Sequence, residues 1–476
     1  MNRLNFYRHI FFIKSNNEIS KFIAILSLLL FVNLEMPASP GYWRVTTLNN
    51  PSPGYLKFYW LSNRHFSLWD NYGKEIYIDS SYININLQNF KMLPSGLWIA
   101  NGSPVPGINK YYMLGQDMEI VDSIPLSNSL IHDFHDVIQL SNGHFLVLYM
   151  NNQIVDMSKL VEGGNPNAVV LNSILVETDR TGTVYWSWNA LDHMNVLDIT
   201  SGIDLRSAVI DFPHANSFCE DTDGNIIVSF RYADEISKIN KQTGNFVWRM
   251  GGSHCINNQF NFTNDNFNGF FGFSHQHSVS MLPNGNILIY DNGNKKEPKY
   301  SRAVEYSYNT ENKTVTKEWE YRYTPDVFVG SMGSAVRLPS GNTLINWGQN
   351  RITEVTPDKQ IAFEMVWEPG SDELAGVYRA FRYVTKMDAV SKSITGQGDY
   401  IFANSVYNTD ITLSISSLSD TGTVSIEKHY YGPPSGAYND SGFTNVLPYR
   451  WVASSKDINS IRSEEHTSEL QSPNTI

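Results

Sequence analysis

The sequence LPNGNILI, residues 282–289, recurs almost unchanged as LPSGNTLI at residues 338–345. In both copies an apolar run leads into a turn with glycine, and a second apolar run follows. This pattern predicts a β-hairpin, because glycine supplies the positive φ that such turns need. Looser copies of the phrase surround Gly96, Gly143, Gly224 and Gly398. We therefore expect a chain built from one repeated strand–turn–strand unit.

A second, looser hairpin follows many copies, as in residues 176–186 around Gly182 and residues 239–248 around Gly244. Two hairpins make four antiparallel strands, which form one blade of a β-propeller. Six copies predict an all-β, six-bladed β-propeller with four-stranded antiparallel blades. Residues 54–79 also resemble strands, and we expect them to pair with residues 443–452 as a closing seam or a seventh blade.

Composition excludes one class of function. The chain has 476 residues, of which 41% are hydrophobic and 13% aromatic, and its net charge is −12. A general nucleic-acid-binding protein needs a basic surface, so we expect no nucleic-acid partner. No long basic run is present that would favour binding to a membrane surface.

The N-terminus has the pattern of an export signal. Four basic residues up to Lys21 precede the apolar run of residues 22–32, and the small residues Ala38 and Ser39 follow. This order predicts a signal peptide over residues 1–38, with an uncleaved anchor as the alternative. We expect a propeller domain over residues 41–461, a periplasmic or secreted location, and no stable membrane span after signal cleavage.

The C-terminus reads RSEEHTSELQS from Arg462 to Ser472. These residues are the translation of a common sequencing-adapter oligonucleotide. Our hypothesis is that the natural sequence departs from this one near Ile461 and that residues 462–476 are an artefact. Resequencing the locus tests it, and a genomic read that continues through these codons would disprove it.

Only two cysteines are present, Cys219 and Cys255. An exported chain can pair them, and burial of two free thiols is the alternative. No CxxC occurs, so the cysteines give no indication of a zinc site.

Several histidines precede the glycine turns at matched distances. His135 and His277 lie eight residues before the glycine of their hairpin, and His214 and His275 lie ten residues before theirs. Side chains on a strand alternate between its faces, so even offsets place all four on equivalent faces if no bulge intervenes. His132, at eleven, would face the other way. The first strand of each blade lines the channel, so we expect histidines from three successive blades to converge there. Separate bonding of each histidine to a neighbouring blade is the alternative.

A histidine cluster of this kind is compatible with several types of reaction. Histidine can act as a base, an acid, a nucleophile or a metal ligand. Few acidic residues are apparent near these strands apart from Asp133 and Asp136, and Arg231 ends a nearby strand, which favours a pocket for an anion. The sequence lacks the GxSxG elbow of serine hydrolases and the P-loop of nucleotide-binding proteins. A metal-dependent lyase or hydrolase and a non-catalytic propeller that binds a sulfated or anionic ligand remain alternatives.

Four short motifs occur in a recognisable order. They are Phe134-His135-Asp136, Phe212-Pro-His214-Ala-Asn216-Ser217, Ser229-Phe-Arg231 and Gln276-His277-Ser278. In order and number they resemble the bacterial arylsulfotransferase family, over about residues 47–451. The resemblance implies a six-bladed propeller that is exported and moves a sulfuryl group between phenols without a nucleotide donor, cofactor or metal. The partners would be a phenolic sulfate donor and a phenol acceptor. The sequence leaves their identity open, and it does not decide whether the chain forms a homodimer.

The resemblance also implies roles for individual residues. His277 would be the nucleophile that is transiently sulfated, with His275 as a competing candidate. His135, His214 and Arg231 would hold the sulfuryl oxygens and assist proton transfer, and Asn216 would be a further donor. The phenol would stack on aromatic side chains at the channel mouth; the candidates, for which packing between blades is the alternative, are Phe271, Phe273 and Trp347.

Overall fold

The computed structural model describes residues 42–60, 65–73, 75–78, 88–93, 95–105, 108–115, 120–127, 129–200, 202–368, 376–383, 387–403, 408–418, 421–429, 450–456 and 461–465. The predicted signal segment, residues 1–38, lies outside these ranges. The chain divides into two compact units, and the one formed by residues 43–368 and 374–476 contains nearly all the described residues.

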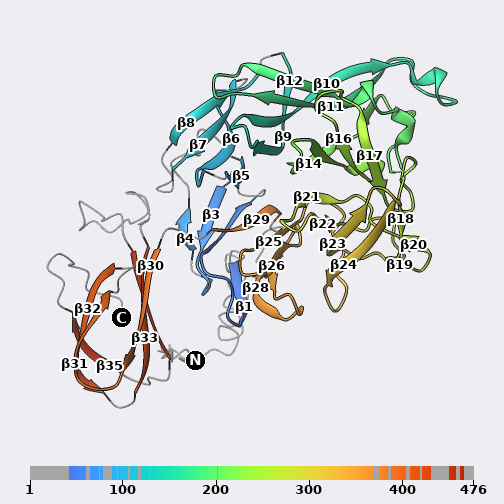
Figure 1. Cartoon of the computed structure of the whole chain (residues 1–476). Helices are drawn as coiled ribbons and strands as arrows, with labels where there is room; N and C mark the ends of the chain where they lie inside the picture. Colours follow the sequence, from blue (N-terminus) through green and yellow to red (C-terminus); the bar gives the residue numbers. More distant parts are fainter. Residues whose placement is uncertain are drawn as a thin grey trace, which may run out of the picture. The chain divides into compact units, whose positions relative to one another are not determined.

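Six small antiparallel sheets follow one another around a ring, which confirms the predicted six-bladed propeller (Figure 1). Each of the first four blades is built from consecutive strands. Blade 1 contains β5 (Gln88–Met92), β6 (Trp98–Val105), β7 (Ile108–Leu114) and β8 (Ile120–Pro125). Blade 2 contains β9 (Ile131–Gln139), β10 (Phe145–Val155), β11 (Ala168–Thr178) and β12 (Val184–Asn189).

Blade 3 contains β14 (Ala215–Glu220), β15 (Ile226–Phe230), β16 (Glu235–Ile239) and β17 (Phe246–Gly251). Blade 4 contains β21 (His277–Met281), β22 (Ile287–Asp291), β23 (Arg302–Asn309) and β24 (Thr314–Arg322). Short parallel strands extend two of these sheets, β13 (Val209–Asp211) along β11 and β18 (Asn261–Phe262) along β24. The pair β19 (Asn266–Phe267) and β20 (Phe270–Phe271) forms a separate hairpin. Four short 3₁₀ helices connect strands in blades 2 and 3: η1 (Met157–Lys159), η2 (Ala190–Asp192), η3 (Val196–Asp198) and η4 (Arg231–Ala233).

The ring is closed by N-terminal strands in two places. Blade 5 contains β25 (Ser334–Arg337), β26 (Thr343–Asn346), β27 (Arg351–Val355) and β28 (Ile361–Glu368), and β1 (Tyr42–Leu48) adds to its outer edge. Blade 6 contains β29 (Val377–Tyr383) as its first strand, followed by β2 (Tyr55–Trp60), β3 (His65–Trp69) and β4 (Glu75–Ile78). Residues more than 300 positions apart therefore share a sheet, for example Tyr55 and Tyr383.

The prediction that residues 54–79 complete a blade is correct, but the predicted partner segment is wrong. They pair with β29, whereas β34 (Arg450–Lys456) pairs with β33 (Gly422–His429) in another sheet. The predicted hairpin around Gly398 is also wrong. Its flanking strands, β30 (Met387–Ile394) and β31 (Gly398–Ala403), belong to different sheets. β31 pairs instead with β32 (Asn408–Leu418), which also pairs with β35 (Ile461–Glu465).

The C-terminal strands form two three-stranded sheets of their own. The first has the order β30 (Met387–Ile394), β33, β34, and the second has the order β31, β32, β35. Apolar side chains from both sheets, among them Val390, Ile394 and Ile415, form one cluster. The segment predicted to derive from an adapter overlaps β35 at residues 462–465, and the rest of it lies outside the described residues. No helix in the described part of the chain is long and apolar enough to cross a membrane.

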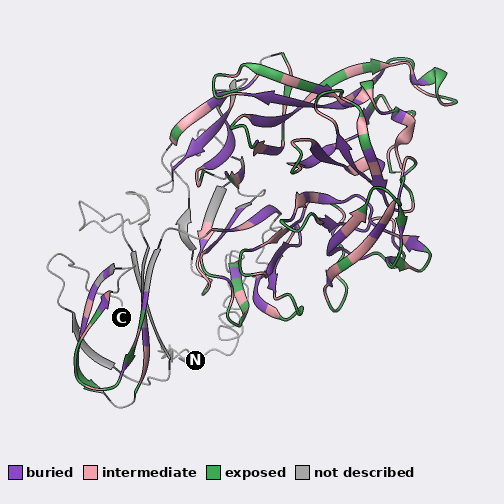
Figure 2. Cartoon of the chain, in the orientation of Figure 1, coloured by how far each residue is buried: buried purple, intermediate pink, exposed green. Residues whose placement is uncertain are grey.

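The propeller core consists of apolar clusters between neighbouring blades, and buried segments run along the strands of every blade (Figure 2). Ile99 of blade 1 shares a cluster with Phe145 of blade 2. Across the closing seam, Leu344 and Phe363 of blade 5 share one with Phe58 of blade 6. Because each cluster needs two blades, no blade can bury its apolar faces alone, and closing the ring completes the core.

Phe58 tests the importance of the closing blade. Its ring is 1% exposed and lies 5.1 Å from that of Trp43 and 6.1 Å from that of Trp69, between centroids. We expect Phe58→Ala to lower the free energy of unfolding by about 3–5 kcal/mol, the usual effect of emptying such a site. Tyr72→Ala, at a side chain 67% exposed in the same blade, is the control and should change it by about 0.5 kcal/mol or less. Equal denaturant midpoints for the two variants would show that this seam does not stabilise the ring.

Candidate active site

The first strands of blades 2, 3 and 4 are irregular at the positions of their histidines. In β9, four residues lie between His132 and Val137, but only one residue of β10 lies between their partners, Tyr149 and Val147. The register also shifts in β14 after Ala215 and in β21 after His277. The assumption of regular strands was therefore wrong. The histidines still come together because all three strands depart from regular pairing at the same end, and such irregularities redirect side chains.

The rings of His135 and His277 both pack against Tyr378, a residue of β29, and the ring of His214 packs against His135. The centroids of His135 and His214 are 4.7 Å apart, with the ring planes tilted by 72°. The Tyr378 ring lies 6.1 Å from His135 and 5.2 Å from His277, edge-on to both, and its hydroxyl donates to the carbonyl of His135 at 3.1 Å. The predicted convergence of histidines from three blades is thus present. As predicted, His132 faces elsewhere, against Tyr111 and Tyr149.

Two of the clustered histidines are paired with carboxylates. Nδ1 of His135 bonds to Asp133, and Nδ1 of His214 lies 2.6 Å from Oδ2 of Asp211. A carboxylate at Nδ1 fixes the tautomer of the imidazole and favours its charged form. At His214 burial and the charges of His135 and Arg231 outweigh Asp211 and lower the pKa below its usual value. Asp133 was apparent from the sequence. Asp211 was missed, although its place three residues before His214 was a usable signal.

His277 has a neutral partner instead. Its Nδ1 donates to the carbonyl of Gly333 at 2.8 Å, so Nε2 carries the lone pair. Burial lowers the pKa of His277 well below its usual value, and repulsion from Arg379, His135 and His214 lowers it further. The side chain is therefore a neutral imidazole, which is the protonation state that a nucleophile requires.

The position of Gly333 depends on its lack of a side chain. Its φ is +90°, and a Cβ here would lie 2.3 Å from the ring of Tyr290. The loop before β25 also offers the carbonyl of Gly330, which accepts bonds from Arg231 at 2.7 Å and Asn294 at 3.0 Å. This loop thus orients both a predicted nucleophile and a predicted anion-binding arginine.

Arg231 lies at the start of η4, beside His214. Its backbone N–H donates to the carbonyl of His214 at 3.0 Å, and its guanidinium lies 4.7 Å from the ring centre of Tyr232. Burial lowers its pKa below the usual value. Tyr232 also packs edge-on against His214 at 5.0 Å. Arg231 therefore adds a positive charge to the histidine cluster.

His275 has a different environment from His277. Its backbone N–H and its Nδ1 both bond to Oδ1 of Asp234, at 2.6 and 2.9 Å, and its ring lies 5.8 Å from Tyr232. His277 instead contacts Tyr378, which also packs against His135. Asp234 is 41 positions away in the sequence and gave no signal of this pairing.

Asn216 connects two strands of the site through hydrogen bonds. Its side chain is fully buried, and its Nδ2 donates to the carbonyl of Gln276 at 2.8 Å. The backbone carbonyl of Asn216 accepts a hydrogen bond from Arg379 at 2.8 Å. The amide thus connects β14 to the residue before His277. Its predicted contact with substrate stays a prediction.

Sequence reasoning missed Arg379 and did not assign Asp136 a partner. Oδ1 of Asp136 accepts bonds from Arg379 and from Lys91, both at 2.9 Å, and Oδ2 accepts the backbone N–H of Phe218 at 3.1 Å. Burial alone would raise the pKa of Asp136, but Arg379 and Lys91 hold it below its usual value. Asp136 is therefore a carboxylate that joins several blades.

The predicted aromatic residues belong to the core. Phe271 and Phe273 pack in the cluster between blades 3 and 4, and Trp347 in that between blades 4 and 5. Packing between blades, the alternative, is thus what the structure shows for them. Phe134 is instead 40% exposed, and its ring stacks on His135 at 4.9 Å with an interplanar angle of 13°.

Both cysteines are free thiols in this structure. Cys255 lies against Glu235, with Sγ 3.7 Å from Oε2. Burial raises the pKa of Cys219 to about 12. Within the described ranges, no group of three or more His, Cys, Asp or Glu side chains is arranged to hold a metal ion.

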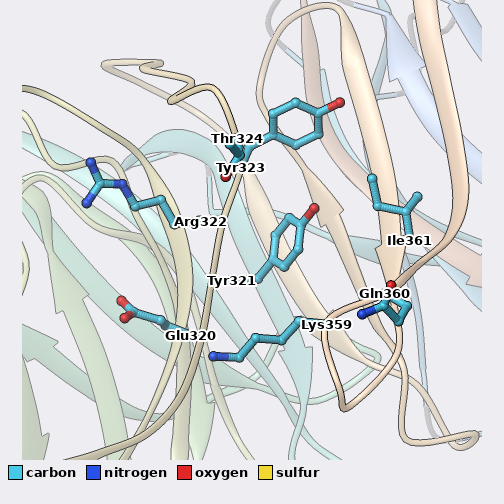
Figure 3. Close-up of a pocket in the computed structure, with 8 residues that line it drawn as sticks. All are labelled: Glu320, Tyr321, Arg322, Tyr323, Thr324, Lys359, Gln360 and Ile361. Atoms are coloured by element: carbon cyan, nitrogen blue, oxygen red, sulfur yellow. The ribbon is translucent and has the colours of Figure 1, made fainter.

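A surface pocket of about 520 Å³ lies apart from the predicted site residues (Figure 3). Its lining comes from residues 320–324, at the end of β24, and from residues 359–361, at the start of β28. Two charged residues of the lining already have partners, since Glu320 pairs with Arg302 and Arg322 with Asp326. We therefore assign the chemistry to the histidine cluster.

Comparisons with known proteins show the family of the chain. A model of the arylsulfotransferase (ASST) family matches residues 30–379. Among solved structures, a Bacteroides caccae protein of unknown function is 11% identical with a TM-score of 0.44, covering 69% of this chain and 98% of that one. A streptogramin B lyase is 13% identical with a TM-score of 0.35, covering 70% and 84%. No curated protein matches the chain. The family match spans most of the sequence, and the chain belongs to the arylsulfotransferase family.

Proposed function

We propose that this protein transfers a sulfuryl group from a phenolic sulfate ester to a phenol, without a nucleotide donor, through a covalent intermediate on His277. The observation that supports this most strongly is the division of roles among the histidines. A neutral imidazole with its Nε2 lone pair available lies in one cluster with two histidine–carboxylate pairs. Nucleophile and proton donors are thereby separate groups, as covalent transfer requires.

In the first half-reaction, Nε2 of His277 attacks sulfur and forms the N–S bond. The bond between sulfur and the aryl oxygen breaks, and its electron pair leaves with the phenolate. A protonated His135 or His214 then gives its proton to that oxygen. Arg231 offers a planar set of N–H donors to the sulfuryl oxygens, which carry the negative charge.

In the second half-reaction, an acceptor phenol attacks the sulfur of the intermediate. Its proton goes to the histidine that was deprotonated, and the N–S electron pair returns to Nε2. The enzyme is regenerated with no net gain or loss of protons, which is a ping-pong cycle. Asp133 and Asp211 stabilise the imidazolium between turnovers, and Phe134 offers an exposed face on which the aryl ring can stack.

We further propose that the protein works outside the cytoplasm, as a periplasmic or secreted enzyme. The support is the signal-peptide pattern of residues 1–38 and the family to which the chain belongs.

The first test is turnover of 4-nitrophenyl sulfate, with and without an added phenol. We expect nitrophenol release that accelerates with the acceptor, and a loss of about 10³-fold or more in His277→Asn. His275→Asn is the matched control and should keep turnover, because Nε2 of His277 is intact. Full activity in His277→Asn would remove it as the nucleophile. Tight binding of the sulfate ester without any turnover in the unaltered protein would favour the binding-only propeller.

The second test concerns proton donation. Asp211→Asn removes the carboxylate 2.6 Å from His214 and should make its imidazolium a poorer store for the proton. We expect kcat to fall by roughly 10–10²-fold with phenyl sulfate and less with 4-nitrophenyl sulfate, since the nitrophenolate leaves without help. Equal losses with both donors would contradict a role in protonating the leaving group.

The third test concerns the carbonyl that orients His277. Gly333→Ala places a methyl group against Tyr290, so we expect a lower free energy of unfolding and a large loss of kcat. Gly143→Ala is the control, because its φ of +87° is equally unfavourable for alanine but no atom lies within 4 Å. It should cost about 1 kcal/mol of stability and leave kcat unchanged. Similar kcat values for both variants would show that this carbonyl does not matter.

A further inference from the structure

Arg379 is a buried cation on β29 that connects two histidine-bearing strands. Its Nη1 donates to Asp136, the residue after His135, at 2.9 Å. Its Nη2 donates to the carbonyl of Asn216, two residues after His214, at 2.8 Å. The side chain is 4% exposed, so both bonds form away from water. Arg379 therefore fixes the strands of His135 and His214 relative to each other.

The same residue is linked to His277 by a short path. Arg379 donates to the backbone carbonyl of Asn216, and the side-chain Nδ2 of Asn216 donates to the backbone carbonyl of Gln276. Gln276 directly precedes His277. The neighbour of Arg379, Tyr378, packs edge-on against the His277 ring at 5.2 Å. Arg379 is thus connected to the proposed nucleophile through Asn216 and Tyr378, whereas Arg231 bonds to the carbonyls of Gly330 and His214.

The charges around His277 come from several elements. Arg379 of β29, His135 of β9 and His214 before β14 all disfavour a positive charge on its ring, and the Gly333 carbonyl opposes them. Asp136 carries one negative charge, while Arg379 and Lys91, which bond to it, carry one positive charge each. These three side chains therefore carry one net positive charge, and the charge of Arg379 is buried. A positive charge in a buried setting acts strongly on a neighbouring imidazole.

We propose that Arg379 is a positioning residue of this site, which holds the strands of the three histidines in register and places a buried positive charge near them. The inference rests on the proposed function, because an unprotonated His277 matters only if it attacks sulfur. Arg379 is not expected to touch the substrate. It acts through Asp136, Asn216 and its charge.

The sign of the effect follows from the charge. Without the positive charge of Arg379, a protonated His277 becomes less unfavourable and its pKa rises. The nucleophile is then lost at acidic pH and recovered at alkaline pH. A purely structural role would instead lower activity by the same factor at every pH.

The test compares Arg379→Gln with Asp136→Asn, which break the same ion pair but change the charge in opposite directions. The titration of His277 is followed by NMR of ¹⁵N-histidine in the full chain, with its signal assigned from its absence in His277→Asn. In Arg379→Gln we expect the midpoint to rise by about one pH unit or more, and in Asp136→Asn no rise. An equal rise in both variants, or none in Arg379→Gln, would overturn the proposal.

Two further variants keep the proposal testable if Arg379→Gln does not fold. Arg379→Lys keeps the charge and should keep the low midpoint. Lys91→Gln removes the other cation at Asp136 from a side chain that is 25% exposed, and it should raise the midpoint less than Arg379→Gln. If Arg379→Gln does not fold, an unchanged midpoint in Lys91→Gln counts against the proposal and a rise supports it.

Turnover separates this proposal from the proposed function. The kcat/KM of Arg379→Gln should fall by a larger factor at the acidic end of the pH range in which the protein is folded than at pH 8, relative to the unaltered protein. Absence of transfer in the unaltered protein, together with the NMR shift, would refute the proposed function but keep the charge effect. Transfer by the unaltered protein, together with a pH-independent loss of activity in Arg379→Gln, would support the proposed function but refute the charge effect.

Discussion

The carboxylate of Asp136 ties four of the six blades together at the centre of the ring. Lys91 reaches it from blade 1, the backbone N–H of Phe218 from blade 3 and Arg379 from blade 6, while Asp136 itself belongs to blade 2. A buried N–H group needs an acceptor, and the first strand of a blade has no strand beside it on the inner side. Side chains of neighbouring blades supply such acceptors, as Ser217 does for Val279 at 2.8 Å.

The histidine cluster depends on this arrangement. The bonds of Asp136 and Asn216 hold irregular stretches of β9 and β14 in place, and those stretches present His135 and His214 to each other. Partners then divide the roles. A carboxylate at Nδ1 favours an imidazolium, whereas burial and the positive charge of Arg379 favour a neutral ring at His277. The three histidines thereby have different hydrogen-bond partners within one site.

Local sequence predicted the parts of this structure that local rules govern. Glycine turns gave five of the blades, and the motifs gave His135, His214, His277 and Arg231. The failures involve contacts between distant residues. Blade 6 pairs its first strand, β29, with β2 from the other end of the chain, so no glycine turn joins these two strands. Arg379 is 243 positions from Asp136, and spacing cannot reveal such a pair.

The central claim is that His277 carries the sulfuryl group between the two phenols. The most direct measurement is a rapid-quench reaction with a ³⁵S-labelled aryl sulfate and no acceptor, followed by peptide mapping under alkaline conditions. We predict about one label per chain on His277, which disappears when a phenol is added before the quench. Label on His275, or transfer to the phenol with no labelled chain at any time, would contradict it.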